Sequence, residues 1–353
     1  MMKSTKQTVV AFIALLLCLT TSCSKKTYMA TLAPEESGLN VIKITDESKN
    51  TVLGVVLSGG HINNAPFSLA GTNKQNNVSW TTVRALSVSP DGEEIAYMTR
   101  VKGQQNILVR STSGSNAATQ RTFRHVGDFS WGNDDNLYFI DITDNQSKLC
   151  AIDAHAGTFM RQLTNNNMDF DPVLSPDGKK VFFTRYEKNS GPAIWSYNLE
   201  NGQLTNCAPG FHPTGISADG NEFICVRNSD AGHSEIWRVN YVNGRETIIL
   251  SDKDRSYTHP AISPNGEWML VTGNSKSSIN KQKNLDIFAV KTDGTSFVQL
   301  TYHPGNDCVP QWSADGESIY FISDRANKDK SFNVRKMNFK PVNGTRTTRQ
   351  SIY

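Results

Sequence analysis

Short apolar runs separated by turn-forming residues recur along most of the chain. From about residue 85 onward each run is only a few residues long, and no ten-residue stretch between runs has the periodicity of an amphipathic helix. Runs of this kind, bounded by Gly, Pro, Asn and Asp, are typical of β-strands. The chain also contains 25 Gly and 13 Pro. We therefore predict an all-β protein and exclude a parallel α/β fold.

A turn motif repeats between these runs. In its first clear copy, Ser89-Pro90-Asp91-Gly92 leads into the apolar run 95–97. Pro or Ala followed by Asp-Gly favours a tight turn, because glycine adopts positive φ and the acidic side chain bonds local amides. Each copy therefore predicts a β-hairpin. The equivalent positions lie 42 to 50 residues apart: Asp91, Asn133, Asp177, Asp219, Asn265 and Asp315.

A third and a fourth apolar segment follow each hairpin. Residues 107–109 are an example of the third, and residues 161–164, which end in Leu-Thr, are an example of the fourth. Four antiparallel strands in a unit of about 45 residues are typical of a propeller blade. We predict a six-bladed β-propeller over residues 83–353, with a seven-bladed ring as the alternative.

The combination of Ser-Pro-Asp-Gly, an apolar second strand ending near Arg, and a Leu-Thr fourth strand resembles the TolB-type, WD-like propeller repeat of Bacteroidetes-like lipoproteins. The resemblance covers residues 85–350. It implies the propeller fold strongly and the function only weakly. Similar blades occur in TolB of the Tol–Pal system, in the lids of prolyl oligopeptidases, in oligogalacturonate lyases and in bacterial lipoproteins.

Residues 39–82 lack the Asp-Gly hairpin but contain two apolar segments, 40–44 and 51–56. These segments either close the ring by pairing with the last blade or form a degenerate seventh blade. We favour closure, because an open ring leaves two sheet edges unpaired. Residues 61–79 are polar and rich in Asn and Gly, and they predict a long loop.

The N-terminus has the pattern of a secretory signal. Lys3 and Lys6 precede an unbroken apolar run over 9–19, which is too short to span a bilayer. The following Leu-Thr-Thr-Ser-Cys resembles the lipobox of bacterial lipoproteins. That resemblance implies that residues 1–22 are removed, that Cys23 carries the acyl chains (palmitate among them), and that 23–38 form a lipidated tether. The alternative is an ordinary signal with an incidental cysteine.

The residues after Cys23 indicate a location for the predicted lipoprotein. Ser24 in place of aspartate resembles lipoproteins that are sent to the outer membrane. Surface-exposed lipoproteins of the Bacteroidetes group often carry acidic residues after the cysteine, so Lys25 and Lys26 imply the periplasmic face. The formal net charge of +3 includes two lysines in the predicted signal. The remainder is nearly neutral, which excludes a phosphate-dominated nucleic-acid binder.

Signatures of catalysis and metal binding are missing from the sequence. It contains no Gly-x-Ser-x-Gly, no His-Glu-x-x-His, no Cys-x-x-Cys and no complete calcium loop. We predict no catalytic residue, no metal and no cofactor. Asp141, Asp144 and Asn145 suggest a loop that holds calcium loosely, but a solvated hairpin loop is the simpler interpretation.

Four cysteines follow Cys23, and an oxidising periplasm would allow two disulfides. Cys207 and Cys225 lie in neighbouring elements of one repeat and are the nearest candidate pair. The alternative is that the cysteines are small buried apolar side chains. The four are Cys150, Cys207, Cys225 and Cys308.

In a propeller the first strand of each blade lines the central channel, so the polar residues that enter these strands are the candidate binding site. The candidates are Arg84, Asp171, His212, His259 and Asp307. We expect the two histidines to converge between the two acids, in a sector suited to a cationic group or a peptide amine. We also expect them to be exposed, so that replacing them leaves stability almost unchanged. The alternative is a mouth that only holds water.

The sequence therefore predicts a non-catalytic envelope lipoprotein, monomeric or part of a complex, whose propeller binds a protein or peptide in the periplasm. Two other functions remain open. One is a glycan-binding surface lipoprotein. The other is a carbohydrate-active, lyase-like enzyme, because His212-Pro213 and His259-Pro260 resemble the metal-binding histidines of oligogalacturonate lyases.

Overall fold

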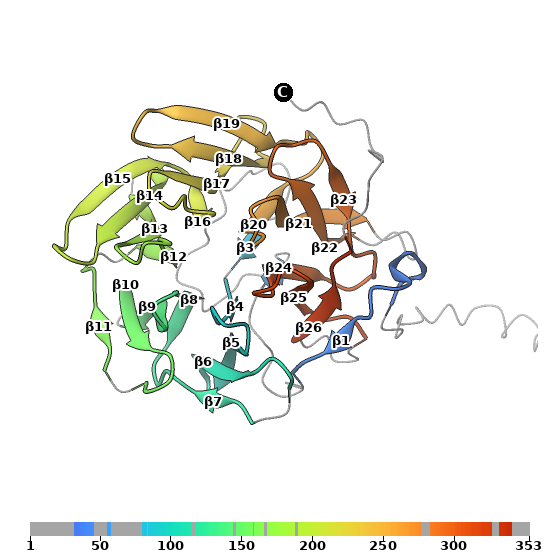
Figure 1. Cartoon of the computed structure of the whole chain (residues 1–353), viewed down its shortest axis with the longest axis horizontal. Coiled ribbons are helices and arrows are strands. Elements are labelled where there is room, and N and C mark those ends of the chain that lie inside the picture. The colour runs from blue at the N-terminus through green and yellow to red at the C-terminus, as the bar shows by residue number, and fades with distance from the viewer. Residues whose placement is uncertain are drawn as a thin grey trace, which may run out of the picture.

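The computed structural model describes residues 32–45, 55–57, 80–82 and 84–340, with short gaps at 115–116, 144–145, 158, 166–167, 188–189, 277–282 and 327–331. Six four-stranded antiparallel sheets are arranged radially around a central channel (Figure 1). The six-bladed propeller predicted from the repeat is confirmed. Within the described residues the helical structure is a single 3-10 turn, η1 (Pro34–Glu36).

The strands follow one another outward from the channel in each of the first five blades. Blade 1 contains β4 (Leu86–Val88), β5 (Glu94–Val101), β6 (Gln104–Ser111) and β7 (Thr119–Gln120). Blade 2 contains β8 (Val126–Trp131), β9 (Asn136–Thr143), β10 (Gln146–Asp153) and β11 (Arg161–Gln162). Blade 3 contains β12 (Asp169–Leu174), β13 (Lys180–Glu187), β14 (Gly191–Asn198) and β15 (Leu204–Pro209).

Blades 4 and 5 repeat this order. Blade 4 contains β16 (Phe211–Thr214), β17 (Glu222–Asn228), β18 (Ser234–Asn240) and β19 (Arg245–Leu250). Blade 5 contains β20 (Tyr257–Ile262), β21 (Trp268–Lys276), β22 (Lys283–Lys291) and β23 (Phe297–Gln299). Blade 6 takes three strands from the end of the chain, β24 (Asp307–Trp312), β25 (Ser318–Ser323) and β26 (Asn333–Asn338).

The outer strand of blade 6 comes from the other end of the chain. Strand β1 (Ile42–Lys43) pairs antiparallel with β26, with Ile42 opposite Lys336. The first predicted N-terminal strand therefore closes the ring, and the seventh-blade alternative is wrong. The second segment, 51–56, does not join a blade in its described part. Strand β2 (Val55–Leu57) pairs with β3 (Trp80–Thr82) in a separate two-stranded ribbon.

The repeated turn joins the first and second strands of each blade, as predicted. Ser89 Oγ donates a hydrogen bond to Asp91 Oδ1 over 2.6 Å and accepts the backbone N–H of Glu94 over 2.9 Å. Glycine follows at positive φ, 77° at Gly92. The same pair of bonds recurs on the turn serines of blades 3 to 6, which are Ser175, Ser217, Ser263 and Ser313.

Blade 2 departs from this motif, and the alignment of Asn133 with Asp91 is wrong by one residue. Asp134 Oδ1 accepts the backbone N–H of Asn136, which is the bond that Asp91 makes to Glu93. Asp135 takes the place of the turn glycine, with φ at 59°. Asp tolerates this left-handed region better than most residues, so the turn survives without glycine.

The core is divided among the interfaces between neighbouring blades. Apolar side chains of the second and third strands fill them; Phe182 of blade 3 meets Phe223 of blade 4 with ring centroids 5.8 Å apart. All four described cysteines are free thiols, and Cys150, Cys225 and Cys308 are buried. The candidate pair Cys207–Cys225 is therefore not bonded, and the alternative of small buried side chains fits Cys150, Cys225 and Cys308.

Some predictions fall partly or wholly outside the described residues. The signal, Cys23 and the loop 61–79 lie outside them, as do Asp144 and Asn145 of the acidic loop. Asp141 belongs to β9, is buried and pairs with Arg124 over 2.5 Å. In the part of the chain that the structure describes, no helix is long and apolar enough to cross a membrane.

A buried polar ring in the channel

A bulge at an X-Pro pair turns one side chain of the first strand toward the channel in blades 3 to 6. The pairing of the first and second strands breaks at Asp171, His212, His259 and Val309, each of which precedes a proline and has φ between 49° and 53°. Positive φ is strained for these residue types, and proline has no N–H to leave unpaired at the bulge. The same backbone strain recurs at one position in four blades, which indicates that the side chain at this position serves the structure or the function of the channel.

The bulges bring together residues from five blades, which we call the channel ring: Arg84, Asp128, Asp171, His212 and His259. His212 Nδ1 lies 2.8 Å from Asp171 Oδ1, and the His212 and His259 ring centroids are 4.8 Å apart. The predicted convergence of the histidines is therefore observed. Their predicted exposure is wrong, because every residue of the channel ring is at most 6% exposed.

Arg84 occupies the place expected for a cationic ligand. Its guanidinium donates to the backbone carbonyls of Pro172 (3.5 Å) and Pro213 (3.0 Å), across the channel from its own blade. Its charge is attracted to Asp171 and Asp128, and its backbone N–H donates to Asp128 Oδ1 over 2.6 Å. The chain itself thus supplies a cation between the two acids, which was not expected from the sequence.

Asp307 does not belong to the channel ring. It lies two residues before Val309, and its carboxylate pairs with Arg325, whose Nε donates to Asp307 Oδ1 over 3.1 Å. Asp169 has the same place in blade 3 and pairs with Arg185. The prediction from sequence therefore groups two different positions of the first strand. One position, that of Asp171, faces the channel, and the other, that of Asp307, faces a buried arginine.

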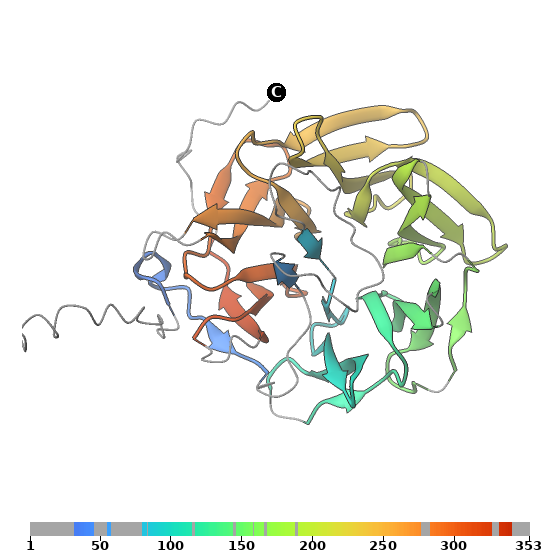
Figure 2. The same cartoon turned by 180° about the vertical axis from the view of Figure 1, so that it is seen from behind.

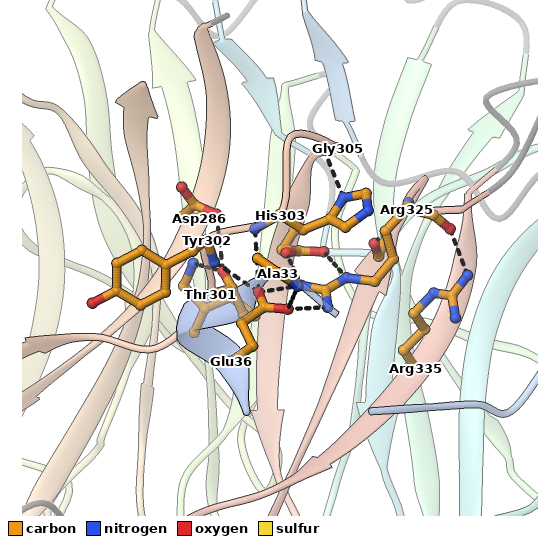
Figure 3. Close-up of polar contacts among 12 residues, drawn as sticks. Ala33, Glu36, Asp286, Thr301, Tyr302, His303, Gly305, Arg325 and Arg335 are labelled. Carbon is orange, nitrogen blue, oxygen red and sulfur yellow. Dashed lines mark hydrogen bonds and ion pairs between the residues drawn. The ribbon is translucent and has the colours of Figure 1, made fainter. Parts of the chain in front are cut away.

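The partner of Arg325 is the N-terminal segment. Glu36 of η1 is fully buried, and its two carboxylate oxygens accept Arg325 Nη1 and Nη2 over 2.8 and 2.9 Å (Figure 3). Glu36 also accepts the backbone N–H groups of Tyr302 and His303. This contact, which we call the latch, joins η1 to blades 5 and 6. Nothing in the repeat pattern indicated it.

Asp128 is the channel-ring residue that sequence reasoning missed. It stands four residues before Gly132, as Asp171 stands four residues before the turn residue Ser175. The signal was therefore present in the spacing. It was hidden because blade 2 has Phe129 where the other bulged strands have proline.

Burial dominates the electrostatics of the channel ring. It raises the pKa of Asp128 well above its ordinary value, and the negative charge of Asp171 adds to this effect. Burial would also raise the pKa of Asp171, but the charge and hydrogen bond of His212, together with Arg84, lower it overall. Asp171 is therefore the ionised acid of the pair, and Asp128 favours its protonated form.

His259 is the residue of the ring with unused bonding capacity. Burial lowers its pKa well below the ordinary value, and the positive charges of His212 and Arg84 lower it further. The imidazole is thus neutral at pH 7, with one N–H donor and one acceptor nitrogen. Both nitrogens are buried without a hydrogen-bond partner. Such a group needs a polar atom of a ligand or a water molecule.

The two ends of the channel differ. Strand β3 ends two residues before Arg84, so the β2–β3 ribbon lies at the end where the first strands begin; both views place it inside the ring of blades (Figures 1 and 2). A pocket of about 330 Å³ lies at the opposite end, where the repeated turns gather. We call this end the turn mouth.

The arrangement defines a six-bladed β-propeller with buried polar residues in its channel. A family model described as the TolB beta propeller domain matches residues 68–278, more than half of the chain. The protein therefore belongs to the TolB β-propeller family. No curated protein matches it in sequence. Within the described residues, no group of three or more His, Cys, Asp or Glu is placed to hold a metal ion.

Solved structures share the fold at low identity. TolB from Acinetobacter baumannii is 16% identical with a TM-score of 0.56, over 71% of this chain and 65% of that one. A putative TolB from Agrobacterium tumefaciens is 17% identical with a TM-score of 0.53, over 73% and 90%. An oligogalacturonate lyase from Vibrio parahaemolyticus is 11% identical with a TM-score of 0.57, over 86% and 95%. The chain thus spans less than two thirds of the Acinetobacter protein.

Proposed function

We propose that this protein is a non-catalytic lipoprotein of the outer membrane, anchored through Cys23 on the periplasmic face, whose propeller holds a partner protein or peptide. Membership of the TolB β-propeller family supports the class of protein. The lipobox-like sequence before Cys23 supports the anchor.

The observation that carries the binding role is His259. A side chain that is 2% exposed, with neither ring nitrogen bonded, lies beside Arg84 and His212 in the channel. This combination of a neutral donor and acceptor next to a guanidinium fits a hydrogen-bonding group such as a peptide amide or a carboxylate. Because Arg84 already sits between the acids, it fits such a group better than the cation expected from sequence.

The test is crosslinking of the lipidated protein in its native envelope, followed by capture of the crosslinked partner. His259→Phe keeps a ring of similar size but removes both nitrogens, and it should reduce partner capture. His233→Phe is the matched control, because His233 is half-buried in the loop between β17 and β18 of blade 4, outside the channel ring and the turn mouth. Equal capture by wild type, His259→Phe and His233→Phe would contradict a role for the channel ring.

One observation favours a second function, polysaccharide cleavage. The fold is shared with an oligogalacturonate lyase, and His212 and His259 lie close together in the channel. Release of unsaturated products from oligogalacturonate by the purified protein, with and without added manganese, tests this directly. A glycan-binding surface lipoprotein is separated from the periplasmic scaffold by protease accessibility on intact cells.

A further inference from the structure

The pocket at the turn mouth has apolar walls from blades 1, 5 and 6. Val88 and Pro90 contribute from blade 1, Ile262 and Pro264 from blade 5, and Trp312 and Ala314 from blade 6. The indole of Trp312 is held in place, since its Nε1 donates to the carbonyl of Ala261 over 3.0 Å. A volume of about 330 Å³ is enough for one large apolar side chain with part of its backbone.

Polar and apolar atoms line the pocket in nearly equal measure. Gln311 and Thr214 are half-buried among the lining residues, whereas the hydroxyls of Ser89 and Ser313 are engaged within their own turns. The Gln311 carboxamide offers both a donor and an acceptor. A hollow with apolar side chains on its walls and polar groups such as Gln311 and Thr214 beside them suits a peptide segment, whose side chain is buried while its backbone is hydrogen-bonded.

The rim of the turn mouth is strongly acidic. Turns of neighbouring blades lie close together: a Cβ added at Gly92 would be 2.9 Å from Ala314 Cβ, and the side-chain amide of Asn133 donates to the Pro176 carbonyl over 2.7 Å. In these turns (89–93, 132–135, 175–179, 215–221, 263–267 and 313–317), nine Asp and Glu are exposed, whereas Lys179 is the exposed base. The nearly neutral chain thus concentrates negative charge here, which attracts cationic partners.

The acids of this rim stay charged in mildly acidic solution. A hydrogen bond from Ser89 lowers the pKa of Asp91, and the backbone N–H of Glu93 lowers it further. Serine hydrogen bonds lower the pKa of Asp177, Asp219 and Asp315 in the same way. The repeated turn therefore builds the fold and keeps a negative border around the pocket.

We propose that the turn mouth is the docking site for a cationic peptide segment, which places one apolar side chain in the pocket while flanking Lys or Arg residues meet the acidic rim. The proposal rests on the scaffold function, and it adds that the partner binds at the turn mouth through a cationic segment. The β2–β3 ribbon lies at the opposite end of the channel, so it does not cover this site.

Three labelled synthetic peptides test the proposal on the purified full chain by fluorescence anisotropy. The probe is Gly-Lys-Lys-Leu-Lys-Lys-Gly; its two controls replace Leu by Ser, or every Lys by Glu. We expect the Ser peptide to bind at least tenfold more weakly, because a buried Leu side chain contributes more than one factor of ten in affinity. We expect no binding of the Glu peptide, and weaker binding of the probe at high salt.

Three variants locate the site. Glu93→Lys combined with Glu317→Lys halves the net negative charge of the rim without touching the Ser–Asp bonds, and it should weaken probe binding at least tenfold. Glu187→Lys combined with Asp230→Lys makes the same change in charge at the opposite ends of the second strands, and it should bind as wild type does. Ala314→Phe partly fills the pocket and should abolish the preference for Leu over Ser.

Equal binding of the Leu and Ser peptides, or wild-type binding by the Glu93→Lys, Glu317→Lys variant, would overturn the proposal. The scaffold function is judged separately, by partner capture in the envelope. If capture persists in the Glu93→Lys, Glu317→Lys variant, the scaffold stands and the turn mouth is not its docking site. If no variant and no wild-type protein captures a partner, the scaffold function fails whatever the peptides do.

Discussion

The imidazole rings of His212 and His259 lie 4.8 Å apart in neighbouring blades, and the second ring has no hydrogen-bond partner for either nitrogen. Two histidines in this relationship cannot both carry a charge without cost. Because burial and the charges of His212 and Arg84 lower the pKa of His259, the folded protein holds this ring in its neutral form.

The first prediction follows from this pKa. Below the ordinary histidine pKa of about 6.5 the unfolded chain binds a proton at His259 that the folded chain does not, so stability falls as pH falls. We expect His259 to cost up to about 1.4 kcal/mol of unfolding free energy per pH unit between pH 6 and 5. Urea unfolding of wild type and His259→Gln at several pH values measures the difference.

The comparison isolates the titration of His259, because the other titratable residues of the channel ring are the same in both proteins. His259→Gln should lose less stability than wild type on going from pH 7 to 5, whereas His155→Gln, at an exposed position, should follow wild type. Parallel pH profiles for wild type and His259→Gln would show that the ring is not held neutral by the fold.

The second prediction concerns both histidines together. His212→Ala combined with His259→Ala removes two buried rings and leaves Asp171 without its imidazole partner. We expect a loss of about 2–5 kcal/mol in unfolding free energy, from lost packing and an unpaired buried carboxylate. If the histidines were exposed, as the sequence predicts, the unfolding free energy would change by less than about 0.5 kcal/mol. Urea titration decides between them, with His155→Ala as the control for an exposed histidine.

The third prediction concerns the latch. Glu36→Ala leaves the buried guanidinium of Arg325 with Asp307 as its remaining acid, and it exposes backbone N–H groups of Tyr302 and His303 to an unfilled space. We expect a loss of about 3 kcal/mol or more. Glu35→Ala, at the neighbouring exposed position, should change stability by less than about 0.5 kcal/mol. Equal melting temperatures for the two variants would contradict the latch.

The fourth prediction uses two turn glycines with similar φ. Gly178 (φ 70°) has open space around an added Cβ, so Gly178→Ala should cost only the left-handed strain, about 1 kcal/mol. Gly92 (φ 77°) would place its Cβ 2.9 Å from Ala314 Cβ at the seam between blades 1 and 6. Gly92→Ala should therefore be the more destabilising change in thermal unfolding, and the reverse order would contradict the contact.

The fifth prediction tests the anchor. Cys23→Ala removes the proposed acylated thiol, so the protein should remain unprocessed or lose its membrane attachment. Growth with labelled palmitate shows whether a fatty acid is attached. Label incorporated equally into Cys23→Ala and wild type would exclude Cys23 as the anchor, whereas Cys207→Ala should keep the label.

Most of the fold can be predicted from the repeat. The recurring turn motif indicates a β-hairpin in each unit, and the spacing between its copies gives the length of one blade. Ser89, Asp91 and Gly92 act within one turn, so their meaning is readable locally. The blade 2 turn was misaligned because Asp135 replaces the glycine that marks the others. Closure by residues 42–43 was predictable from the need to pair the sheet edges.

The candidate site was harder, because it depends on which face of a strand each residue occupies. A shift of two positions separates Asp307, which faces Arg325, from Val309, which shares the ring position with His259. The bulges that decide this are signalled by X-Pro, but Asp128 lacks the proline. The buried channel ring is made up of residues from five different blades. The ion pair of Glu36 with Arg325 joins residues far apart in the sequence. Neither can be predicted from a local sequence pattern.

The latch has a consequence for how the protein is made. Glu36 and Arg325 are separated by 289 residues, yet they complete the same blade. Synthesis proceeds from the N-terminus, so η1 and β1 must wait, without their partners, until the last blade has been made. The entropy of closing so long a loop grows only slowly with its length, but the closure comes last. Until then β1 has no strand to pair with, and the apolar face of blade 1 that packs against blade 6 is uncovered. This is the interval in which the nascent propeller is open to aggregation and to proteases.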